Sequence, residues 1–188
     1  MQSYHLALAY IAATLLTLSI FYMLRFLFIF KKPDRHLYFA LCTLGGSFFV
    51  LCAILLPATT EPDTVLLLHK LRILALMLCV SAWFFCMYDI YFKGARLPKI
   101  FLAITIAAAL TTPFDIFLSL PIREIRVTFC GLPILYRFAT TGLSYSVYAA
   151  LLLLFFIIST ARVALGRNLT VGKAYGLWAF LPGVIGGD

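Results

Sequence analysis

The chain has 188 residues, of which 64% are hydrophobic and 12% charged, and its mean hydropathy is +1.05. Soluble domains are usually about 45–50% apolar and about 25% charged, so this composition excludes a water-soluble fold. The net charge of +8 argues against nucleic-acid binding, because the basic residues stand at the ends of apolar segments, where they set membrane orientation and meet lipid headgroups.

Three long apolar segments open the chain and predict helices over residues 3–30, 36–56 and 63–92. Each is long enough to cross a bilayer, since the hydrocarbon core is about 30 Å thick and a helix needs roughly 20 residues to span it. The first segment has no basic residues before it and is too long for a secretory signal, so we expect it to be retained. Gly45 and Gly46 predict a close helix contact within the second segment.

The third helix begins at a sequence typical of a helix N-terminus, with Asp63 or Thr64 as the capping residue. At 1.5 Å per residue this helix is roughly 44 Å long and must tilt or project from the membrane. The polar residues one to two turns from its start mark the projecting part; they are His69, Lys70 and Arg72.

The second half of the chain predicts helices over 98–120, 138–163 and 173–187, with a kink at Pro113 in the first of them. Between the first two, residues 121–136 alternate β-branched with charged side chains, which favours a short strand or hairpin. The prediction is therefore an all-α polytopic membrane bundle that forms one domain over residues 1–188. We expect a seventh helix and a cytoplasmic output domain to follow it.

Charge sets the expected orientation. If the spans alternate, ten of the fifteen Lys and Arg residues fall on one side and five on the other. The positive-inside rule then places the ten-cation side in the cytoplasm and the N-terminus outside. The sequence thus predicts a multi-pass protein of the bacterial inner (plasma) membrane.

Few residues suggest chemistry. Asp89 stands four residues before Lys93, the spacing of an interfacial ion pair on a helix. The five cysteines form no CxxC pair and the three histidines are not at metal-ligand spacing, so neither a metal nor a cofactor is expected. No nucleophile and base stand at catalytic spacing, and we expect no enzymatic activity from these residues themselves.

Four segments resemble a known family, the seven-helix N-terminal sensor regions of bacterial signalling proteins. They read RHLYFALCTLGGSFFVLCAILL, EPDTVLLLHKLRILAL, FCGLPILYRF and GRNLTVGKAYGLWAFLPGVIGG. Such regions precede histidine kinase, diguanylate cyclase or PAS-containing modules. The resemblance implies a sensory input module that does no chemistry in the membrane and works as a homodimer of the full-length protein, with the lipid bilayer as its partner.

If the resemblance holds, a small molecule or lipid on the outer side would bind between the outer halves of the third, fourth and fifth helices. The polar residues expected to line that pocket are Arg72, Asp115, Arg123 and Tyr148. The alternative is a small transporter or permease, which would show internal repeats and broken helices at the membrane midplane. A membrane enzyme is a third possibility, but the sequence contains no catalytic set of residues to support it.

Overall fold

A computed structural model describes residues 2–29, 35–91, 97–129 and 132–165. This part of the chain is mostly helical and holds five α-helices, a short 3-10 helix and one two-stranded antiparallel hairpin. The helices are α1 (Gln2–Phe28), α2 (Arg35–Leu55), α3 (Pro62–Tyr91), α4 (Leu97–Thr111) and α5 (Leu143–Leu165). The other elements are η1 (Leu56–Ala58), β1 (Leu118–Phe129) and β2 (Leu132–Thr141).

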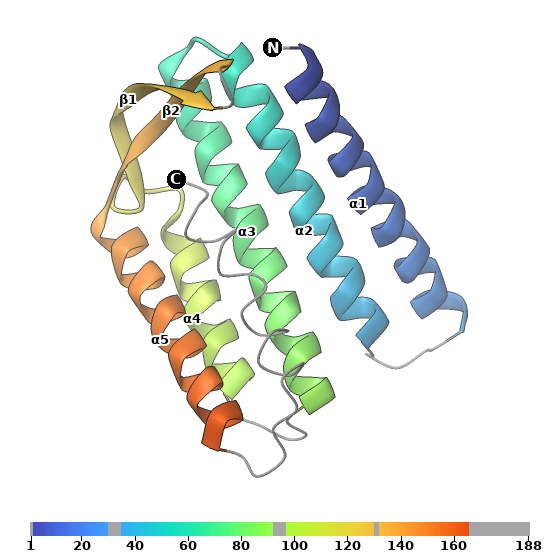
Figure 1. Ribbon diagram of the computed structural model, residues 1–188. Coiled ribbons are helices and arrows are strands. Elements are labelled where there is room, and N and C mark those ends of the chain that lie inside the picture. The colour runs from blue at the N-terminus through green and yellow to red at the C-terminus, as the bar shows by residue number, and fades with distance from the viewer. Residues whose placement is uncertain (1, 30–34, 92–96, 130–131, 166–188) are drawn as a thin grey trace.

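The helices lie side by side, with α1 and α2 on one side of α3 and with α4 and α5 on the other (Figure 1). Hairpin β1–β2 continues from α4 and leads into α5, and it packs against the first turns of α3 and against η1. We call this end of the molecule the hairpin end. Helices α1, α3 and α5 begin there and α2 and α4 finish there, so the helices alternate in direction.

Small residues hold α1, α2 and α3 close together. The Ser19 hydroxyl donates to the Ala40 carbonyl at 2.8 Å, and the Ser47 hydroxyl donates to the Ala12 carbonyl at 2.9 Å, so each of α1 and α2 bonds the other. On the opposite face of α2, a Cβ added to Gly45 would lie 2.6 Å from the Ala75 carbonyl oxygen of α3. The helix contact predicted at the two glycines is confirmed at this position.

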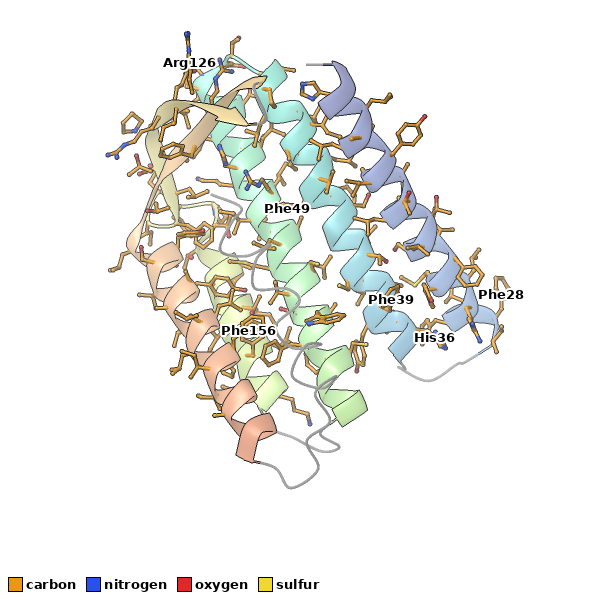
Figure 2. All side chains as sticks on the ribbon, viewed as in Figure 1. Phe28, His36, Phe39, Phe49, Arg126 and Phe156 are labelled. Atoms are coloured by element: carbon orange, nitrogen blue, oxygen red, sulfur yellow. The ribbon has the colours of Figure 1, made fainter. Side chains whose placement is uncertain are left out.

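Aromatic rings fill the core between α3, α4 and α5. Phe84 of α3 stacks on Phe101 of α4, with ring centroids 4.8 Å apart, and meets Phe156 of α5 edge-on at 5.7 Å. All three side chains are almost fully buried. Figure 2 shows Phe156 on the side of α5 that faces α4. Such rings bury large apolar areas, so this cluster supplies much of the attraction between the two halves of the bundle.

Three helices are long and apolar enough to cross a membrane. They cover His5–Phe28, His36–Ala58 and Pro62–Cys86, with mean hydropathies of 2.0, 2.4 and 2.0. Two further apolar helices, Lys99–Thr111 and Leu143–Ile158, are shorter. Large apolar side chains such as Tyr10, Phe21 and Leu110 are more than half exposed, which suits contact with lipid tails rather than water.

The predicted fourth helix, 98–120, is wrong in its second half. Helix α4 stops at Thr111, and Pro113 lies beyond its end instead of kinking it. The last turn before the stop is tighter than an α-helical turn, because the Thr112 N–H bonds the carbonyl of Ala109, three residues back. A proline has no N–H to continue the helix and disfavours helical geometry in the residue before it, which explains the stop.

The predicted fifth helix, 138–163, begins too early, and the hairpin is longer than the predicted 121–136. Strand β2 continues to Thr141, so the fold is helical with a β-hairpin and not all-α. Gly142 makes the extension possible: a Cβ there would lie 2.0 Å from the Ile116 carbonyl oxygen. Its N–H also bonds the Phe117 carbonyl at 2.9 Å. The predicted helix 173–187 lies outside the described residues.

Candidate functional site

The four residues predicted to line a pocket lie in different surroundings. Arg72 faces α2, where its guanidinium carbon lies 4.7 Å above the ring of Phe49 (Figure 2). Asp115 follows α4 and its side chain is 83% exposed. Arg123 is exposed on β1, opposite Phe138 of β2.

Tyr148, the fourth of these residues, is buried in the aromatic core on α5. Its hydroxyl makes no hydrogen bond within the described residues, and Thr105 of α4 lies near it without meeting hydrogen-bond geometry. Tyr148 thus lies in the aromatic core, Arg72 against α2, and Asp115 and Arg123 at exposed positions near the hairpin. Ligand binding by them stays a prediction.

A different polar cluster joins the hairpin to the helices. Its centre is Arg137 on β2, whose side chain is only 14% exposed. The Arg137 Nε donates to Glu124 Oε1 at 2.6 Å, and the two residues are cross-strand partners in the hairpin. An N–H of the same guanidinium donates to the carbonyl of Thr59, the residue that follows η1 as its C-cap. One side chain therefore ties β1 and β2 to the end of α2.

His69 of α3 holds the same strand from the other side. Its Nε2 lies 2.6 Å from the Arg137 carbonyl oxygen, and the side chain is buried. A carbonyl oxygen can only accept, so Nε2 must carry the hydrogen in this contact. Because both the backbone carbonyl and the side chain of Arg137 are hydrogen-bonded, the position of β2 relative to α3 is closely fixed.

Lys70, the next residue of α3, holds the connection between α4 and β1. Its Nζ donates to the Pro113 carbonyl at 3.1 Å and lies 3.9 Å from Asp115 Oδ1. The Lys70 side chain is largely buried, whereas the Asp115 carboxylate is open to solvent. We call the whole set the hairpin clamp; its residues are Thr59, His69, Lys70, Pro113, Asp115, Glu124 and Arg137.

The electrostatics of the hairpin clamp rest on backbone as well as on carboxylates. Thr59 follows the end of α2 and η1, and Pro113 follows the end of α4. Arg137 and Lys70 each donate to one of these two backbone carbonyls in addition to facing a carboxylate, so both cations have a backbone partner even though Glu124 and Asp115 are exposed to solvent.

The base of the hairpin carries one more polar contact. The Thr111 and Ser144 hydroxyls are 2.5 Å apart and join the end of α4 to the start of α5. The Ser144 N–H bonds the Ile116 carbonyl at 3.1 Å. These bonds connect the base of the hairpin to both helices. A displacement of the hairpin must therefore also displace the end of α4 and the start of α5.

Sequence reasoning missed the hairpin clamp although it noted most of its parts. His69 and Lys70 were expected to project beyond the membrane, and the alternation around Glu124 predicted a strand. The missing piece was Arg137, one of the five cations on the side with fewer positive charges. Pairing β1 with β2 in register would have placed Arg137 opposite Glu124, and this is the signal that was available.

No protein-family model, curated protein or solved structure matches the chain. Within the part of the chain that the structure describes, no group of three or more His, Cys, Asp or Glu side chains is placed to hold a metal ion.

Proposed function

We propose that this chain is the membrane-embedded input module of a bacterial signal-transduction protein. The hairpin end receives the stimulus, and α3 carries the response along the bundle toward a cytoplasmic output domain. The observation that supports this best is the hairpin clamp, because adjacent residues of α3, His69 and Lys70, hold the hairpin and the end of α4 at once.

Helix α3 is suited to relay a displacement because it belongs to two packed groups. Its Ala75 backbone lies against Gly45 of α2, while its Phe84 ring belongs to the aromatic cluster with α4 and α5. The first contact is a close fit of two backbones. The second is an apolar packing without hydrogen bonds, and packed helices of this kind move relative to one another by small shear displacements. A shift of the hairpin, α4 and α5 relative to α3 is the motion this arrangement favours.

The hairpin clamp gives that motion two states. With its bonds formed, β2 and the end of α4 are fixed to α3; with them broken, the hairpin is held by its junctions with α4 and α5. A ligand, lipid or membrane state that favours one arrangement would shift the population by its difference in affinity. Each charge-assisted bond is worth about 1.5–3 kcal/mol, so a stimulus of ordinary affinity suffices.

The membrane placement follows from length and charge. Helix α3 has 30 residues and is about 45 Å long, which exceeds the roughly 30 Å hydrocarbon core. The part of α3 that extends beyond the hydrocarbon core lies at the hairpin end if the bilayer is centred on the apolar helices. From the charge asymmetry of the sequence we propose that this end faces the outer side of the inner membrane, where the hairpin would meet ligands or lipid headgroups.

The buried polar side chains favour sensing over transport. In the described residues the most deeply buried ones are hydroxyls and His69, and the largely buried cations Lys70 and Arg137 lie at the hairpin end. Several bond backbone carbonyls, as Ser47 does on α1 and Thr105 within α4. This is the use expected of polar residues that fasten helices, whereas ion routes need ionisable groups in the bilayer interior.

The test compares variants of the full-length protein in membranes. Arg137→Ala and Glu124→Gln should change basal output, read as autophosphorylation or cyclic-dinucleotide synthesis according to the output domain. Arg126→Ala is the matched control, because Arg126 lies on the same hairpin and points away from the bundle (Figure 2). Unchanged output in Arg137→Ala, at equal abundance in the membrane, would show that the hairpin clamp does not control signalling.

A further inference from the structure

Two thiols meet between α2 and α3. The Sγ atoms of Cys42 on α2 and Cys79 on α3 are 3.6 Å apart, although the residues are 37 positions apart in the chain. The two residues are 6% and 5% exposed. Both fall within helices that are long and apolar enough to cross a membrane. A pair of thiols in contact inside the bilayer is a chemical site that the signalling proposal does not use.

The backbones of α2 and α3 approach closely beside these thiols. Gly45 stands three residues after Cys42, and a Cβ added to it would lie 2.8 Å from the Cys79 backbone nitrogen. A disulfide has an S–S bond of about 2.05 Å and Cβ atoms about 3.5–4.5 Å apart, so it forms where two backbones approach in this way. The sulfurs need to close about 1.5 Å, a distance that side-chain rotation covers.

The surroundings of the pair select what can react with it. Ala82 is buried against the two cysteines, and Leu41 and Trp83 pack beside them. Charged, water-soluble thiol reagents such as glutathione do not enter an apolar environment of this kind. A neutral, lipid-soluble oxidant dissolves in it, and quinones are the two-electron oxidants of that class.

We propose that Cys42 and Cys79 form a dithiol site that a membrane quinone oxidises to an interhelical disulfide. One thiol adds to the quinone, and the second attacks the sulfur of that adduct. The S–S bond forms, both S–H bonds are broken, and the quinone leaves as quinol with the two electrons and two protons. The reverse reaction with a quinol, or reduction by a lipid-soluble dithiol, restores both thiols.

The disulfide would fix α2 to α3 at the level of Gly45. A cross-link removes conformations in which the helices separate or slide past each other, and it leaves the aromatic contact between α3 and α4 unchanged. The chemistry of the pair can be measured without any signalling output, so its test is independent of the function proposed above.

The experiment uses the full chain in lipid nanodiscs, treated with decylubiquinone under argon. The protein is then unfolded in detergent and its thiols are counted with a maleimide that adds mass. The sequence holds five cysteines, so we expect three reactive thiols after oxidation, five after treatment with dithiothreitol, and one quinol per disulfide. Cys42→Ala and Cys79→Ala should each abolish quinol formation.

Cys52→Ala and Cys86→Ala are the matched controls, since they remove buried cysteines from the same two helices. Both should retain the loss of two thiols and the yield of quinol. The proposal is overturned if the wild-type protein keeps five thiols in the presence of the quinone. It is also overturned if Cys42→Ala produces as much quinol as wild type, or if the disulfide found by peptide mapping joins other cysteines.

Discussion

Replacing Gly45 by alanine should force α2 and α3 apart. The new Cβ would lie 2.6 Å from the Ala75 carbonyl oxygen, whereas ordinary contacts begin at 3.4 Å, so the helices must separate by about 0.8 Å. The obstacle is backbone and cannot rotate away. Overpacking of this kind costs about 1–3 kcal/mol. Alanine's better helix propensity returns about 1 kcal/mol, which leaves a net loss of about 0–2 kcal/mol.

Gly46→Ala is the control, because the two glycines are neighbours on the same helix. A Cβ on Gly46 would meet the Leu15 Cδ1 atom at 3.4 Å, and that atom ends a side chain that can rotate. We expect Gly46→Ala to be neutral or stabilising by up to about 1 kcal/mol. The two variants should then differ by about 2 kcal/mol, which is more than tenfold in the unfolding equilibrium constant.

The assay is reversible unfolding in mixed micelles with a rising mole fraction of dodecyl sulfate, followed by far-ultraviolet circular dichroism. Gly45→Ala should shift the transition to lower dodecyl sulfate, and Gly46→Ala should not. Equal transitions for the two variants would refute the reasoning, because they would show that α2 and α3 are not packed backbone to backbone at Gly45.

Further expectations concern the hairpin end and the contact of α1 with α2. Gly142→Ala should prevent correct docking of the hairpin, since the new Cβ would lie 2.0 Å from the Ile116 carbonyl oxygen; limited proteolysis should then cut the hairpin faster than in wild type, and equal rates would contradict this. Lys70→Met should lower the free energy of unfolding by about 1.5–3 kcal/mol through loss of a charge-assisted bond, and unchanged unfolding in micelles would count against that bond. Ser47→Ala should lower the free energy of unfolding by about 1 kcal/mol, because it removes the hydrogen bond to the Ala12 carbonyl. An unchanged free energy of unfolding would contradict that hydrogen bond.

Composition and local pattern were enough to predict the helices that could cross a membrane. The predicted ranges 3–30, 36–56 and 63–92 agree within two residues with α1, α2 together with η1, and α3. A run of apolar residues fixes where a helix lies along the chain, because each residue contributes its own transfer free energy. The strand pattern after α4 was also visible in sequence, and the hairpin is there.

The predictions failed where a distant residue decides a local structure. Strand β2 extends to Thr141 because Gly142 allows close contact with Ile116, 26 positions earlier, and no local window contains both. The predicted ligand-binding residues stay a prediction. They were chosen for polarity and depth, and only the structure shows that Arg72 faces Phe49 of α2 and that Tyr148 is buried in the aromatic core.

Hydropathy along the chain thus determined that this is a helical protein suited to a membrane, with a hairpin after its fourth helix. Tertiary structure alone decided which polar and sulfur-bearing side chains meet. The Arg137 guanidinium donates to the Thr59 carbonyl, 78 positions away in the sequence. The Cys42 thiol on α2 lies against the Cys79 thiol on α3. Such encounters depend on the rotation and separation of packed helices, which arise from many weak contacts summed over the whole bundle and not from any single segment.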